Sequence, residues 1–228
     1  KRRLEVMRDS VARGLQGVRS KSGLTGGDAL RMAEAQSRGA LIGAEPLNSA
    51  MAYALAVAEV NAAMGRIVAA PTAGSCGILP GVLLSVANTL DSNDASLIEA
   101  LFSAGAVGAV VARSSTLAGA AAGCQAECGT GAAMAAAAAT ELAKGSPRHS
   151  ANSVAFAFKG LLGLVCDPVA GLVEVPCIKR NAMCVAVALA AADMALAGID
   201  SVVPPDEVIE TMGLIGRELP ASLRENAL

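Results

Sequence analysis

The feature that most limits the fold is an alanine-rich segment over residues 127–144. Alanine has the highest intrinsic helix propensity, so this segment predicts a helix. Aromatic residues make up only 2% of the chain, with no Trp, one Tyr and three Phe. The core must therefore be built from Ala, Val, Leu and Met, whose small volumes favour closely packed helices.

Apolar spacing, capping residues and prolines predict the other helices. An amphipathic helix is expected within residues 1–17, then helices over about 29–38 after an Asp28 cap, 46–64 with Pro46 in the first turn, 82–90, 95–111, 150–164, 181–196 and 206–217. The segments 71–81, 119–123 and 166–177 are expected to be irregular. Because no run of strands and no repeat is visible, the 228 residues predict one compact all-α, multi-helix domain, residues 1–228.

Charge and cysteine content exclude some functions. The formal net charge is −2 and the charges are dispersed, so the basic surface typical of nucleic-acid binding is absent. Residues 1–17 form a charged amphipathic stretch, not the apolar centre of a signal peptide. We therefore expect a cytoplasmic protein, in which six cysteines indicate metal binding or catalysis more than disulfides.

The mean hydropathy of +0.52 raises the question of a membrane protein. Residues 67–90 carry no charge and are long enough to span a bilayer. However, prolines and glycines at 71, 74, 77, 80 and 81 interrupt that run, and such backbone is tolerated at membrane depth only inside protein or around a water-filled cavity. No membrane association is therefore expected, and a small-residue helical membrane bundle stays an alternative.

The six cysteines do not have the close pairs of a zinc site. Cys124 precedes the alanine-rich helix, and Cys166 and Cys177 bracket a proline-containing loop. Thiolates near helix N-termini are stabilised by the helix dipole and by unpaired N–H groups. From position alone, a buried core thiol is still the ordinary interpretation of each cysteine.

Five segments carry a resemblance to a known family. They are residues 25–28 (TGGD), 61–65 (NAAMG), 71–75 (PTAGS), 123–127 (GCQAE) and 166–181 (CDPVAGLVEVPCIKRN). In this order they resemble the α chain of bacterial iron–sulfur L-serine dehydratases, and the likeness runs from about residue 11 to residue 224. Relatives extend further at both ends, so we expect this chain to be truncated relative to the family.

The resemblance implies an all-α chain that holds a 4Fe–4S cluster through Cys124, Cys166 and Cys177, in loops and at helix N-termini. Three thiolates leave one iron without a protein ligand, and that iron would act as a Lewis acid on the hydroxyl of L-serine. The products would be pyruvate and ammonia. The family pattern does not require the other three cysteines, Cys76, Cys128 and Cys184, which we interpret as core thiols.

Two turns are candidates for binding the substrate carboxylate through backbone N–H groups. Their residues are Thr25, Gly26 and Gly27 in the first turn, and Thr72, Ala73, Gly74 and Ser75 in the second. Helix punctuation is the competing interpretation of both. Lys179 and Arg180 follow Cys177 and either offset the charge of the cluster or of the substrate, or simply face solvent.

The catalytic base is not identified by the sequence. His149, the single His, lies in a polar turn, where a solvated side chain is the ordinary outcome. We therefore expect the base on a separate β chain, docked on an exposed apolar patch; a homo-oligomer also stays open. A pyridoxal-phosphate serine/threonine dehydratase is the alternative enzyme, but the five lysines lack a Gly-rich phosphate loop and an α/β scaffold.

Overall fold

The structure, a computed structural model, describes residues 1–169 and 171–224. Ala170 of the 166–181 motif and residues 225–228 of the predicted domain lie outside the described residues. The α-helices are α1 (Arg2–Gly14), α2 (Asp28–Ser37), α3 (Leu47–Ala62), α4 (Ile78–Thr89), α5 (Asp94–Ser114), α6 (Gly119–Ala122), α7 (Thr130–Leu142), α8 (Pro147–Lys159), α9 (Glu174–Leu196) and α10 (Pro205–Glu218). A π-helix, η1 (Gln125–Gly129), precedes α7, and a 3₁₀-helix, η2 (Ala221–Leu223), follows α10. The described residues contain no strand, only two isolated bridges, which confirms the all-α prediction.

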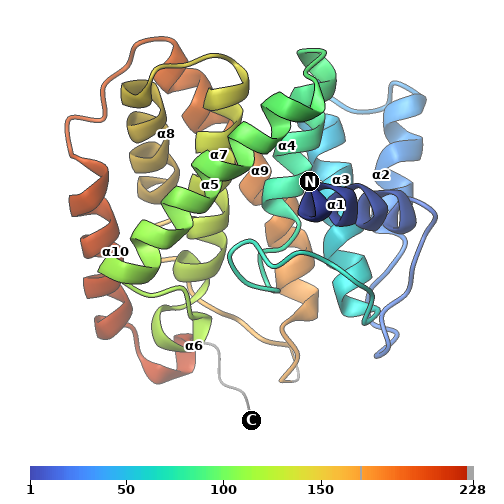
Figure 1. Ribbon diagram of the computed structural model, residues 1–228. Helices are drawn as coiled ribbons and strands as arrows, with labels where there is room; N and C mark the ends of the chain where they lie inside the picture. The colour runs from blue at the N-terminus through green and yellow to red at the C-terminus, as the bar shows by residue number, and fades with distance from the viewer. Residues whose placement is uncertain (170, 225–228) are drawn as a thin grey trace.

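The alanine-rich helix α7 lies in the middle of the bundle beside α9 (Figure 1). It packs against α4, α5, α8 and α9, and residues 130–140 are all buried. In Figure 1, α8 and α10 lie on one side of this pair, and α1, α2 and α3 lie on the other. The segment with the smallest side chains therefore sits where the most helices meet.

Glycine allows α3 and α4 to touch backbone to backbone. A Cβ atom at Gly77 would lie 2.3 Å from the carbonyl oxygen of Ala54, and one at Gly81 would lie 2.7 Å from that of Ala50. Neither distance is possible for a real side chain. The contact confirms the expectation of closely approaching helices, and it fixes the end of the 71–77 loop against α3.

Several helices begin earlier than the sequence predicts, because proline is tolerated in a first helical turn, where its missing N–H has no helical partner. Helix α4 begins at Ile78 with Pro80 in its first turn, and α9 begins at Glu174 with Pro176 in the same place. Helix α8 begins at Pro147 and ends at Lys159, before the predicted end at 164. The expected connection at 119–123 contains the short helix α6.

Asp28 is not the cap of α2, contrary to the prediction. It is the first residue of the helix, and its carboxylate pairs with Lys179 and with Arg31, the latter at 2.8 Å. The backbone N–H of Asp28 instead donates to Glu59 Oε1 at 2.7 Å. A buried carboxylate of α3 therefore accepts the N–H that a local cap would have taken, and α2 is joined to both α3 and α9.

Two helices are long and apolar enough to cross a membrane by length and composition, namely α5 and α9. In their most apolar windows, 28% and 44% of the residues are buried, and core helices of soluble proteins pass the same test. The charge-free run at 67–90 divides into a loop and the shorter helix α4.

Candidate functional site

The three cysteines named by the resemblance come from three separate segments. Cys124 directly precedes η1, Cys166 lies in the loop after α8, and Cys177 lies in the first turn of α9. All three side chains are buried, although each lies in a loop or at a helix start. The Cys166 segment is fixed by a backbone hydrogen bond of 2.9 Å from Cys166 N to Leu223 O, and all six cysteines are free thiols.

The thiols at the start of η1 and α9 face one another. Cys128 and Cys177 both donate toward the Cys124 sulfur, and these contacts hold the pKa of Cys124 well below its usual range despite burial. The same contact, together with burial, raises the pKa of Cys177, to which the charges of Cys124, Cys166 and Glu127 also contribute. Cys124 and Cys177 are therefore in contact, and the charge of Cys166 acts on Cys177 as well.

Arg180 connects the cysteine segments by charge. Its Nη1 atom donates to Cys124 Sγ at 3.3 Å and pairs with Asp167 Oδ1 at 2.5 Å. Its side chain is only 15% exposed, so it is not the solvated residue that was one of the two interpretations. The guanidinium lies on the helix of Cys177, contacts Cys124 and holds the residue that follows Cys166.

Within the described residues, no three His, Cys, Asp or Glu side chains converge as the ligands of a single metal ion would. Each thiolate of an iron–sulfur cluster binds a different iron, so cluster ligands lie farther apart than the ligands of one ion. Three buried thiols on separate segments, one of them in contact with the Arg180 guanidinium, have the chemistry that such a cluster requires. The residues fit the cluster that the resemblance implies.

Of the other cysteines, Cys128 contacts the candidate ligand Cys124, and Cys184 contacts Cys128. Contact with Cys124, then with Cys184, raises the pKa of Cys128, as does burial. Cys76 contacts a different part of the core: its Sγ atom lies 4.0 Å from Val57 O of α3, and burial raises its pKa to about 12. Cys76 is therefore a core thiol, whereas Cys128 packs directly against a candidate ligand.

A pocket of about 290 Å³ opens beside Cys177. Its wall includes Ala73 and Gly74 of the second candidate turn, and asparagine side chains bind the carbonyl oxygens of these two residues. Asn61 Nδ2 donates to Ala73 O at 3.1 Å, and Asn181 Nδ2 donates to Gly74 O at 2.7 Å. The candidate turn and a candidate ligand therefore share one cavity.

Asn181 also ties this turn to α9. Its side chain is fully buried and donates to Cys177 O at 2.7 Å, while its Oδ1 atom accepts from Gly77 N at 2.8 Å. Sequence reasoning missed this role because the partners are about a hundred residues away. The available signal was an asparagine at the start of the apolar stretch that fills most of the rest of α9.

The first candidate turn lies elsewhere. Thr25 to Gly27 do not line the pocket, and their backbone N–H groups serve local structure: Thr25 N donates to Ser20 Oγ at 3.3 Å and Gly27 N to Val18 O at 3.1 Å. Gly26 has φ 138° and lies so close to Val18 that a Cβ would be 2.4 Å from its carbonyl oxygen. Asp28 and its pair Lys179 connect this turn to the start of α9.

His149 serves as a capping residue. Its backbone N–H donates to Ser146 Oγ at 3.3 Å, and its Nδ1 atom accepts from Ser146 N at 3.3 Å, which forms a capping box at the start of α8. It lies in the first turn of a helix, not in the turn between helices that the sequence suggested.

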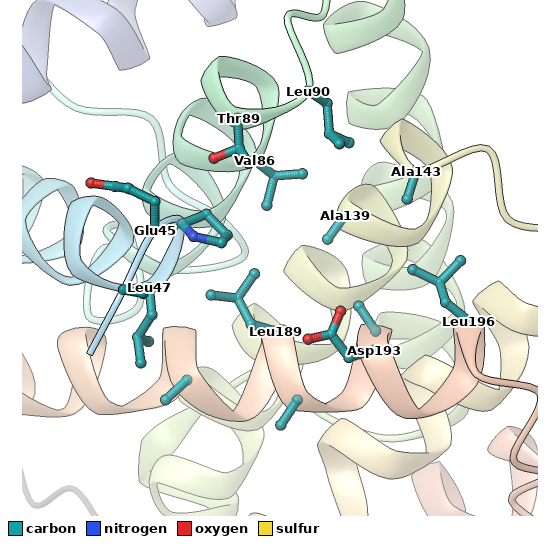
Figure 2. A pocket seen from close by; sticks show the side chains of 15 residues that line it. Glu45, Leu47, Val86, Thr89, Leu90, Ala139, Ala143, Leu189, Asp193 and Leu196 are labelled. Atoms are coloured by element: carbon teal, nitrogen blue, oxygen red, sulfur yellow. The ribbon is translucent and has the colours of Figure 1, made fainter. Parts of the chain in front are cut away.

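A larger cavity of about 520 Å³ lies toward the other end of α9 (Figure 2). Its lining is mostly Ala, Leu and Val, and Figure 2 shows Asp193 projecting toward it from α9. Asp193 is 16 residues after Cys177 on this helix, roughly 24 Å along its axis. None of the candidate ligand or substrate-binding residues lines it, so it is separate from the cysteine site.

Comparisons with known proteins agree with these observations. The family model "Serine dehydratase alpha chain" matches residues 1–228. A probable L-serine dehydratase α chain of Bacillus subtilis (strain 168) is 52% identical over 222 residues, which cover 97% of this chain and 74% of that protein. The L-serine dehydratase α chain of Peptoniphilus asaccharolyticus is 41% identical over 226 residues, 99% and 77% of the two chains. An L-serine dehydratase of Escherichia coli (strain K12) is 45% identical over 177 residues, which cover 77% of this chain but 39% of that protein.

Proposed function

Since the chain belongs to the serine dehydratase α-chain family, we propose that it is the α chain of an iron–sulfur L-serine dehydratase, which converts L-serine to pyruvate and ammonia. The observation that carries the proposal is the contact of Cys124 with Cys177, on which the charge of Cys166 also acts, together with a pocket that Cys177 lines with Ala73 and Gly74 of the candidate turn. These residues would hold a 4Fe–4S cluster. When bound, the cluster would supply a Lewis acid at the iron that has no protein ligand.

The chain's own residues then have to orient serine next to the cysteines. The side-chain amides of Asn61 and Asn181 donate hydrogen bonds to the carbonyl oxygens of Ala73 and Gly74, and these bonds fix the direction of the peptide groups in this turn. A turn with fixed peptide groups is pre-organised to meet the substrate carboxylate, and holding a reactant in one geometry is itself a large part of catalysis. The Thr25–Gly27 turn does not line the pocket, but Asp28 joins it to α9, and it stays a proposed second contact for the substrate.

A β chain is proposed as the partner that completes the site. The relatives from Bacillus subtilis and Peptoniphilus asaccharolyticus are named α chains, and the Escherichia coli enzyme is much longer than the segment that this chain matches. A base with a pKa near neutrality is usually His, and the one His of this chain caps α8. The outer face of α5 is apolar, with Phe102 76% exposed and Val110 43% exposed, and is our candidate for the docking patch.

A cytoplasmic location is part of the proposal, because six free thiols and a thiolate-bound cluster require a reducing compartment. The apolar face of α5 also fits the alternative of a membrane bundle. Purification without detergent separates the two: a monodisperse protein supports the docking surface, and a strict detergent requirement supports the membrane bundle.

The test is to purify the protein without oxygen, assay iron and acid-labile sulfide, and measure pyruvate formation from L-serine with and without the β chain. We expect bound iron in the isolated chain and substantial turnover only with the β chain. Full turnover by the isolated chain would show that the base lies in this sequence. Turnover in air without bound iron would favour pyridoxal-phosphate chemistry.

A further inference from the structure

The charges of the pocket beside Cys177 are all of one sign. Among the described residues that line it, the charged side chains are Glu127 and Glu174, and the polar ones are Asn61 and Asn181. Two carboxylates in a partly buried setting attract an ammonium group. An amino acid carries both a carboxylate and an ammonium group. Of these two groups, the ammonium is the one that the carboxylates of the pocket attract.

Glu127 is placed by η1, the π-helix that follows Cys124. Single-turn π-helices frequently occur at functional sites, because they turn a side chain out of the regular helical register. The carboxylate lies against the candidate turn: a Cβ atom at Gly74 would be 2.7 Å from Glu127 Oε2. Its charge also helps to raise the pKa of Cys177. Glu127 therefore lies between the candidate turn and a candidate cluster ligand.

Glu174 lies at the start of α9, on the same pocket. Its Oε1 atom accepts a hydrogen bond from Ser22 Oγ, so one oxygen of this carboxylate has a fixed role in the loop before α2. Glu127 directly faces the turn where the substrate carboxylate is proposed to bind. Glu127 is therefore better placed than Glu174 to contact the ammonium group, which is bonded to the carbon next to the substrate carboxylate.

We propose that Glu127 binds the ammonium group of the amino-acid substrate, with Glu174 adding negative charge at the same pocket. The proposal rests on the proposed function and adds to it the group that distinguishes a 3-hydroxy amino acid from a 3-hydroxy acid. Gly74 is the residue that leaves room for this carboxylate, since any larger side chain would meet it.

The experiment compares two ligands that differ only in the amine. The cluster-loaded α–β complex is titrated without oxygen with L-serine and with 3-hydroxypropionate, and binding is followed by the cluster's absorbance spectrum and, after one-electron reduction, by its electron paramagnetic resonance spectrum. Glu127→Gln keeps the size of the side chain and removes its charge. The matched control is Glu141→Gln near the end of α7, where the carboxylate accepts from Ser103 Oγ at 3.2 Å, away from the pocket.

We expect Glu127→Gln to weaken L-serine binding by about tenfold to a hundredfold, the range for a lost charge-assisted hydrogen bond, and to leave 3-hydroxypropionate binding unchanged or stronger. Glu141→Gln should bind both ligands as the wild type does. Glu127→Asp, which keeps the charge on a shorter side chain, should restore part of the preference for L-serine over 3-hydroxypropionate. If Glu127→Gln does not load iron, Glu127→Asp is compared with the wild type in its place.

Equal weakening of both ligands in Glu127→Gln would mean that Glu127 acts only on the structure of the site, and unchanged L-serine binding would mean that it does not contact the substrate. Either result overturns the assignment. A wild-type complex that holds no iron and responds to neither ligand would instead overturn the proposed function, and the ammonium site with it.

Discussion

Replacing Asn181 with Ala is expected to be among the most damaging single changes near the site. The side chain makes three hydrogen bonds of 2.7–2.8 Å, to Gly74 O and Cys177 O and from Gly77 N, and it is fully buried. Each hydrogen bond contributes about 1 kcal/mol net, and a buried group left without a partner costs about 1–3 kcal/mol. Because the partners at Gly74 and Gly77 would be orphaned, we expect a loss of about 3–4 kcal/mol in the free energy of unfolding.

Urea denaturation of the iron-free protein measures this loss directly, since the unfolding free energy falls linearly with denaturant concentration. Asn152→Ala is the matched control: Asn152 also lies on a helix and bonds to Asp200 Oδ1 at 3.0 Å and Ser201 N at 3.1 Å, near the surface. Its replacement should cost about 1 kcal/mol, because water can take over the partners. If the two substitutions cost the same, the network around Asn181 does not hold the 71–77 turn as described.

Three other outcomes are expected. Burial raises the pKa of Glu59 above its ordinary value of 4.5, so the native protein binds this proton more tightly than the unfolded chain does. The free energy of unfolding of the Glu59→Gln variant should therefore rise relative to that of the wild type as the pH increases from 4.5 through the native pKa. A difference between the two proteins that does not depend on pH would contradict this. His149→Ala should cost up to about 1 kcal/mol in urea denaturation through the lost capping contact, and should leave serine turnover of the α–β complex unchanged. Turnover should fall in air and return with ferrous iron and a reductant, because an iron without a protein ligand is the most exposed atom of its cluster; loss that iron does not reverse would contradict the open site.

Local patterns predicted the helices well where one cause dominates. The alanine content of α7 acts within a few residues, so it predicts the helix without knowledge of the rest of the fold. The starts of α4 and α9 were placed too late, because Pro80 and Pro176 were interpreted as helix breakers. In a first turn, proline removes only an N–H that has no helical partner, and sequence alone does not say in which turn it lies.

The site was predictable only in part, for a physical reason. The residues near Cys177 come from α3, the 71–77 loop, η1 and α9, and nothing in the spacing of the sequence shows that these segments meet. The resemblance supplied the cysteines and the turns, but it did not supply the contacts that organise them. Glu59 was detectable as the single charged residue of α3, and Glu127 lay inside a quoted motif, yet both roles depend on long-range packing.

The most direct test of the central claim is the iron and sulfide content of cysteine variants prepared without oxygen. The wild-type chain should carry about four irons and four sulfides. Cys124→Ser, Cys166→Ser and Cys177→Ser should each lose them, while Cys76→Ser, which removes a buried thiol that contacts Val57 O of α3, should retain most of the wild-type content. Full iron in Cys166→Ser, or loss of iron in Cys76→Ser equal to that in Cys166→Ser, would contradict the assignment of the three ligands.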